Sequence, residues 1–219
     1  MSSTARDVAR ALLAAGAVAL RPDEPFTWAS GLRSPIYCDN RLVLAVPESR
    51  SAIAEALADR VRQRGVLPDA VAGVATAGIP QAALLADRLA LPLAYVRAAP
   101  KAHGRGNRIE GRVEPGWRVV VVEDLISTGG SSLQAVEALR EAGAEVQAVL
   151  AVFSYGLPVA EQAFASAGVP LEALSDLEAL LEEAGASGGL SERQLEDVRA
   201  WRADPGGWSR ARGGAGAGA

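Results

Sequence analysis

The chain has 219 residues, of which 49% are hydrophobic and 22% are charged. This length suits one domain with a substantial core, and the composition excludes a chain that is disordered throughout. The 22 basic and 26 acidic residues give a net charge of −4, which excludes a global basic field for nucleic acid or anionic lipid.

Cysteine usage and hydropathy narrow the class of protein further. The single cysteine, Cys38, excludes an intramolecular disulfide and a cysteine-rich metal site, and it fits a reducing cytoplasm. The apolar run of residues 11–20 is too short to span a bilayer and has no clear cleavage site. We therefore expect a cytoplasmic protein without a targeting or membrane segment.

The N-terminal part predicts a helix followed by a small cap. Residues 4–15 have helical composition, begin at a threonine and stop before Gly16. From residue 26 to 47, prolines, glycines and aromatics surround short apolar runs, which predicts loops and short strands outside the central sheet. Pro47 then opens a helix to about residue 64, closed by Gly65.

The middle of the chain alternates apolar runs with amphipathic segments. Unbroken apolar strands that alternate with helices are typical of a parallel sheet covered on both faces, so the fold class is α/β. The predicted strands are residues 70–75, 91–96, 117–122 and 145–153, and the predicted helices are residues 80–89 and 131–142.

The C-terminal part predicts a last strand at residues 171–174 and a last helix at 191–201, opened by a Ser-x-x-Gln capping box. The final GGAGAGA has no side chains that could anchor it, which predicts a flexible tail. We expect one domain over residues 1–205, with a cap at 1–46, a core at about 47–155 and a tail at 206–219.

A basic, glycine-rich loop follows the second predicted strand. Residues 97–116 read RAAPKAHGRGNRIEGRVEPG. A loop of this length without its own structure is uncommon in a compact domain unless it is functional, so we predict a mobile cationic lid. Its cationic or titratable side chains are Arg97, Lys101, His103, Arg105, Arg108 and Arg112.

The stretch VVVVEDLISTGGS, residues 119–131, joins a buried strand to two acids and a small-residue loop. Open α/β sheets bind ligands at the carboxyl ends of their strands. The glycines let backbone N–H groups point inward, and the following helix adds its positive dipole end, which together suit a phosphate. Carboxylates accept hydrogen bonds from vicinal hydroxyls, so the motif predicts a sugar phosphate. The alternative is a solvated strand end followed by a generic turn.

The same stretch resembles the phosphoribosyl diphosphate (PRPP) motif of type I phosphoribosyltransferases. Three further segments are similar to the orotate phosphoribosyltransferase family: FTWASGLRSPIYCDNR (26–41), VAGVATAGIPQAALLADRLALPLAYVR (71–97) and APKAHGRGN (99–107). The resemblance implies the type I fold, a parallel sheet flanked by helices with an N-terminal cap and a flexible lid. It also implies conversion of orotate and PRPP to orotidine 5'-monophosphate and pyrophosphate, in pyrimidine biosynthesis.

The resemblance further implies residue roles. PRPP binding falls to Arg97, Lys101, His103, Glu123, Asp124, Leu125, Ile126, Ser127, Thr128, Gly129, Gly130 and Ser131. Catalysis falls to Lys101, His103 and Asp124, and orotate binding to Ser127, Tyr37, Cys38 and Arg33. Mg²⁺ is implied as a cofactor held mainly by PRPP and water, without a protein metal ligand. A homodimer in which the lid reaches the neighbouring subunit's site is implied as well.

Several alternatives stay open at this point. The alternative for His103 is an exposed residue without a functional role. The alternative for Tyr37 and Cys38 is a place in the core, since both residue types are commonly buried. Residues 154–156 lack the arginine that some family members place there, so the partner of the orotate carboxylate is open. The competing functions are a PRPP-dependent transferase for a purine or uracil, and a regulator that senses PRPP without chemistry. The regulator requires a basic nucleic-acid face, which the acidic balance disfavours.

Overall fold

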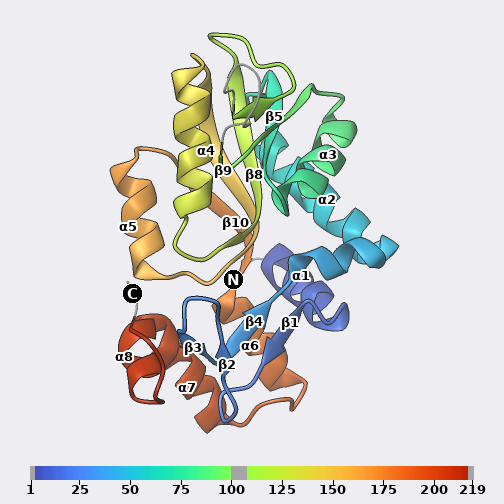
Figure 1. Ribbon diagram of the computed structural model, residues 1–219. Coiled ribbons are helices and arrows are strands. Elements are labelled where there is room, and N and C mark those ends of the chain that lie inside the picture. Colours follow the sequence, from blue (N-terminus) through green and yellow to red (C-terminus); the bar gives the residue numbers. More distant parts are fainter. Residues whose placement is uncertain (1–2, 100–107, 217–219) are drawn as a thin grey trace.

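The computed structural model describes residues 3–99 and 108–216 of the chain, and a six-stranded sheet lies at its centre (Figure 1). The strand order is β10-β9-β8-β5-β6-β7. All neighbouring pairs are parallel except β6 and β7, so the sheet is mixed at one edge. The strands are β5 (Ala70–Val74), β6 (Leu93–Val96), β7 (Ile109–Glu110), β8 (Arg118–Ile126), β9 (Glu145–Ser154) and β10 (Leu171–Asp176).

Helices cover both faces of the sheet, as the unbroken apolar strands predict. Side chains alternate between the faces along a strand, so a run of valines is buried on both sides. Val119 and Val121 pack with α4 (Gly130–Glu141) and α5 (Pro158–Ser166). Val120 and Val122 belong to the other core, with residues of helices on the opposite face. Those helices are α1 (Ser3–Ala14), α2 (Pro47–Gln63), α3 (Gly78–Leu89), α6 (Leu177–Ala186) and α7 (Glu192–Ala203).

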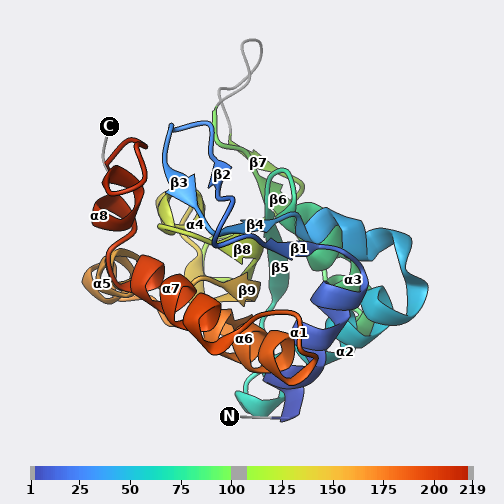
Figure 2. The same ribbon diagram turned by 90° about the horizontal axis from the view of Figure 1, so that it is seen from below.

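A cap lies beyond the central sheet, as predicted, and the C-terminal helices lie beside it (Figures 1 and 2). It consists of two small antiparallel sheets, β1 (Val18–Leu20) with β4 (Ile36–Cys38) and β2 (Phe26–Thr27) with β3 (Arg33–Ser34), followed by the 3-10 helix η1 (Asn40–Ala45). Aromatic rings join the cap to the core. Trp28 stacks on Tyr155 at a centroid distance of 5.7 Å and meets the edge of Trp201 at 5.8 Å.

Beyond small shifts at element ends, two parts of the predicted core differ from the structure. Strand β8 continues through the two acids to Ile126, because its pairing with β9 extends to Ile126 and Ser154. The acids are therefore part of the strand. The loop predicted between the second and third strands contains β7, which pairs with β6 through Tyr95–Glu110 and Val96–Ile109. Helices α5 and α6 are not predicted from the sequence.

The prediction of a flexible tail from residue 206 is wrong over the described residues. Pro205–Arg210 form helix α8, in which Trp208 is 7% exposed. Trp208 Nε1 donates to Asp197 at 3.0 Å, and the Arg212 guanidinium lies 3.7 Å from the centre of its ring. Further on, the Ala215 N–H donates to the Gly31 carbonyl at 3.0 Å. The glycine-rich segment lacks anchoring side chains, but its backbone forms hydrogen bonds without them.

We expect Trp208→Ala to lower the free energy of unfolding by about 3 kcal/mol, because it empties a large buried volume and removes the Asp197 hydrogen bond. Urea unfolding of the variant and the wild type measures this change. Leu67→Ala is the control, since Leu67 is 51% exposed. A Trp208→Ala midpoint equal to that of the control would show that α8 is not anchored.

Candidate functional site

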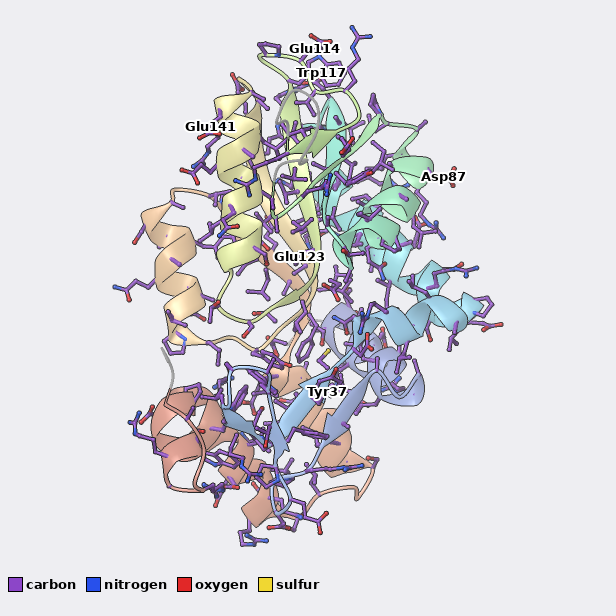
Figure 3. All side chains as sticks on the ribbon, viewed as in Figure 1. Tyr37, Asp87, Glu114, Trp117, Glu123 and Glu141 are labelled. Carbon is purple, nitrogen blue, oxygen red and sulfur yellow. The ribbon has the colours of Figure 1, made fainter. Side chains whose placement is uncertain are left out.

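The carboxyl ends of the parallel strands face the cap. Figure 3 shows Trp117, just before β8, at the end of the molecule far from the cap, and Glu123 at the strand end toward Tyr37 of the cap. The ends of β5, β8 and β6 lie side by side, because β5 pairs with both neighbours. Open α/β sheets bind their ligands at this edge, so the predicted site residues on these strands meet where a ligand is expected.

Glu123 and Asp124 form an acidic pair at the end of β8. Glu123 is only 5% exposed, its Oε2 accepts from Ser132 Oγ at 3.0 Å, and its Oε1 accepts from the Asp124 N–H at 3.1 Å. Burial raises the pKa of Glu123 to about 8, and the neighbouring Asp124 charge adds to this rise. Burial also raises the pKa of Asp124. Because burial disfavours two negative charges on this pair, it is better suited to hydrogen bonds with neutral hydroxyls than to binding a cation alone.

The turn after β5 passes directly beside this pair. A Cβ on Gly78 would lie 2.5 Å from the Val122 carbonyl oxygen and 3.3 Å from Glu123 Oε1. Only glycine permits this approach, which brings the start of α3 against the end of β8. This turn therefore brings its backbone beside Glu123, at the strand end where the sequence predicts a ligand.

The loop between β8 and α4 forms the second part of the site. Gly129 has a φ of +82°, and a Cβ there would lie 2.5 Å from Phe164 Cε2 of α5. Helix α4 begins at Gly130, and the N–H groups of a first helical turn have no partner within the helix. Together with the helix dipole, these groups suit a phosphate. Ile126, the last residue of β8, is buried, so its side chain does not contribute to this loop.

A cavity of about 680 Å³ lies between this loop, the cap and the C-terminal segment. Ser127 and Thr128 contribute polar atoms to its wall, and most of the remaining lining is apolar. Trp28, Leu32, Leu157 and Pro205 are among the apolar residues. Apolar walls with a few polar groups are typical of small-molecule sites.

The cap residues predicted to bind orotate separate into two places. Tyr37 and Cys38 lie on β4; Tyr37 is 48% exposed, which argues against the core-filling alternative for it. Cys38 Sγ donates to Asn40 Oδ1 at 3.0 Å, and burial raises the pKa of its thiol. Arg33 lies on β3, in the other small sheet, where its N–H donates to Ser209 Oγ at 2.8 Å.

Two residues near the acids are missing from the sequence prediction: Asn40 and Ser132. Asn40 Nδ2 donates to the Asp124 carbonyl at 2.6 Å, and Ser132 holds Glu123. Asn40 lies inside the segment 26–41, and Ser132 directly follows the motif at 119–131. Their types gave no reason to separate them from their neighbours, because their roles depend on contacts between distant segments.

Arg97 follows β6 at the same edge of the sheet. Its N–H donates to the Arg108 carbonyl at 2.9 Å, and its guanidinium lies 3.6 Å from Glu110 Oε1. Three of the other predicted lid residues, Lys101, His103 and Arg105, lie outside the described residues. Within residues 3–99 and 108–216, no cluster of three or more His, Cys, Asp or Glu side chains is placed to hold a metal ion. No helix in this described part is long and apolar enough to cross a membrane.

The chain is similar to known proteins over most of its length. The family model of the phosphoribosyl transferase domain matches residues 42–157. The chain is 55% identical over 202 residues to the orotate phosphoribosyltransferase of Bacillus caldolyticus, covering 92% of this chain and 98% of that one. It is 51% identical over 205 residues to the orotate phosphoribosyltransferase of Cytophaga hutchinsonii, covering 94% and 98%.

The fold is also similar to those of solved structures. The orotate phosphoribosyltransferase of Aeropyrum pernix is similar with a TM-score of 0.72 and 39% identity, covering 82% of this chain and 98% of that one. The UMP synthase of Leishmania donovani is similar with a TM-score of 0.75 and 31% identity, covering 90% of this chain and 42% of that one.

The raised pKa of Glu123 predicts a pH dependence of stability. Between its usual value of 4.5 and about 8, the folded state holds a proton that the unfolded state has lost, so stability falls as the pH rises through this window. We expect the free energy of unfolding of Glu123→Gln to fall less than that of the wild type between about pH 5 and pH 8.

Urea unfolding across this pH range measures the difference. Glu141→Gln is the control, because Glu141 is exposed on α4, away from the cap (Figure 3). Parallel curves for wild type and Glu123→Gln would contradict the assignment of a buried, protonated Glu123.

Proposed function

We propose that this chain, which belongs to the orotate phosphoribosyltransferase family, transfers the 5-phosphoribosyl group of PRPP to orotate. The products are orotidine 5'-monophosphate and pyrophosphate, in the synthesis of pyrimidine nucleotides. The observation that carries this conclusion is the buried acid pair beside the glycine loop at the end of β8. It occurs in a chain that is 55% identical to an orotate phosphoribosyltransferase over 202 residues.

In this proposal the two parts of the site hold the two ends of the ribose. Backbone N–H groups of Thr128 to Ser131 bind the 5-phosphate at the start of α4. Asp124 and Glu123 accept hydrogen bonds from the 2- and 3-hydroxyls. This division explains why carboxylates lie next to an anion site: they face the sugar and not the phosphate.

The reaction breaks the bond between C1 of the ribose and the pyrophosphate oxygen, and it forms a bond from C1 to a ring nitrogen of the orotate anion. Negative charge accumulates on the departing pyrophosphate. Fixed cations near that position stabilise the transition state, and we assign this role to Arg97, Lys101 and His103. Arg97 is the first residue of the predicted lid segment. Its neighbour Val96 accepts a hydrogen bond from the Ala75 N–H at 2.9 Å, so Arg97 lies beside the turn after β5.

The family resemblance implies Mg²⁺, and the donor chemistry of the site fits it. Carboxylate oxygens such as those of Asp124 are ligands that Mg²⁺ accepts, but the ion usually keeps water and substrate phosphate oxygens around it. We propose that PRPP and water would hold the ion. Asp124 would bind the ribose hydroxyls and would not itself be a metal ligand. When bound, Mg²⁺ neutralises charge on the pyrophosphate.

For the base, we propose Ser127 as a polar contact, together with Tyr37, Cys38 and Arg33 of the cap. Ser127 supports this assignment because it lines the cavity next to the phosphate loop. Tyr37 and Cys38 support it because they lie two to three residues before Asn40, which contacts the acid-bearing strand. The backbone N–H of Arg33 donates to Ser209 Oγ, which places Arg33 where the cap meets the C-terminal segment.

The proposal predicts which base is consumed. We expect the protein, incubated with PRPP and Mg²⁺, to consume orotate and release pyrophosphate, and to leave uracil and hypoxanthine unchanged. Reactions are followed by chromatography of the nucleotide products, with and without EDTA. Consumption of hypoxanthine or uracil in place of orotate would contradict the base assignment, and undiminished turnover in EDTA would contradict the Mg²⁺ proposal.

We also propose that the chain works as a cytoplasmic homodimer whose lid enters the partner's site. We expect Lys101→Ala to lower kcat by about 10²–10³-fold, as for a lost oxyanion donor, and Lys101→Arg to retain more activity because it keeps the charge. Mixing Lys101→Ala with an inactive Asp124→Ala variant should restore activity, since a mixed dimer contains one intact site.

Native mass spectrometry of the two variants, one isotopically labelled, verifies that subunits have exchanged. Mixing labelled and unlabelled Lys101→Ala alone is the control and should restore nothing. Absence of recovered activity after proven exchange would show that the lid serves its own chain.

A further inference from the structure

We infer that Asn40 is a positioning residue for the acid pair and acts through the backbone of Asp124. Asn40 begins η1 in the cap and is 1% exposed. Its Nδ2 donates to the Asp124 carbonyl oxygen at 2.6 Å, across 84 residues of sequence. The inference rests on the proposed function, in which Asp124 holds the ribose hydroxyls.

The end of β8 depends on this contact because the sheet supports it on one side only. Pairing with β5 ends at Val122, opposite Gly73, while pairing with β9 continues to Ile126. The two acids therefore lie on a stretch of strand that extends beyond β5. Asn40 contributes a hydrogen bond to this stretch from the cap, where the sheet no longer provides a second neighbour.

Both polar atoms of the Asn40 side chain, Oδ1 and Nδ2, form hydrogen bonds. Cys38 Sγ donates to its Oδ1 at 3.0 Å, which leaves Nδ2 to donate to Asp124. Asp39 caps η1 by accepting from the Arg41 N–H at 3.2 Å, so the start of the 3-10 helix that carries Asn40 is also held. A buried amide whose donor and acceptor are both satisfied keeps one orientation.

This arrangement links two halves of the site. The cap segment that presents Tyr37 and Cys38, assigned to the base, is connected through Asn40 to the strand assigned to the ribose. Reacting groups that shift by about 1 Å can lose about 10²-fold in rate. Removal of the Asn40 amide leaves the partly buried Asp124 carbonyl without this donor and frees the strand end from the cap.

We expect Asn40→Ala to lower kcat/KM for PRPP by about 10²-fold and to weaken PRPP binding in titration calorimetry. Asn40→Asp is the second variant, because it keeps the shape and an acceptor for the Cys38 thiol while removing the donor. Ser175→Ala is the matched control. Ser175 is also 1% exposed, and its Oγ donates to the Ala5 carbonyl at 2.8 Å on edge strand β10. It should lower the thermal midpoint and leave kcat/KM unchanged.

A double-mutant cycle with Asp124→Asn separates positioning from general stability. If Asn40 acts through Asp124, Asn40→Ala changes kcat/KM and PRPP affinity by less than about threefold in the Asp124→Asn background. An equal loss in both backgrounds, or wild-type kinetics in Asn40→Ala and Asn40→Asp, overturns the inference.

The same measurements distinguish this inference from the proposed function. A wild type that binds PRPP but consumes no orotate contradicts the proposed function, and the cycle is then read from PRPP affinities alone. A wild type that does not bind PRPP contradicts both.

Discussion

Two adjacent carboxylates, Glu123 buried and Asp124 partly buried, lie beside the loop to which we assign phosphate binding, and this constraint shapes the end of β8. Burying a charge without partners is costly, so each carboxylate needs hydrogen bonds or a proton. Glu123 accepts hydrogen bonds from the Ser132 hydroxyl and the Asp124 N–H, and burial raises its pKa to about 8. Gly78 allows the start of α3 to close over the pair without a steric clash. In the proposed complex, this strand end presents acceptors to the sugar hydroxyls, while the first turn of α4 presents donors to the phosphate.

The rest of the molecule holds the cap against this strand end. Trp28, Tyr155 and Trp201 form an aromatic cluster that joins the N-terminal cap, the end of β9 and helix α7. The C-terminal segment then crosses back to the cap, where Ser209 and Ala215 contact Arg33 and Gly31. Residues from the two ends of the chain thus build one side of the cavity whose other side includes Ser127.

Local patterns were sufficient to predict the central sheet and that the two acids and the glycine loop lie at the carboxyl end of a central strand. The valine run is buried on both faces, as a parallel strand between two helical layers requires, and the acids followed by glycines indicate the ligand edge. Contacts between distant segments could not be predicted in this way. Asn40 and Asp124 are 84 residues apart, and nothing in the composition of CDNR indicates that its asparagine contacts the catalytic strand. The C-terminal segment looked unanchored because glycine and alanine lack anchoring side chains, but its backbone pairs with the cap.

A crystal structure with PRPP and Mg²⁺ tests the central claim most directly. The account predicts the 5-phosphate within hydrogen-bond distance of the backbone N–H groups of residues 128–131, and the ribose diol on the carboxylates of Asp124 and Glu123. A phosphate bound elsewhere, or a diol that contacts neither carboxylate, would contradict it.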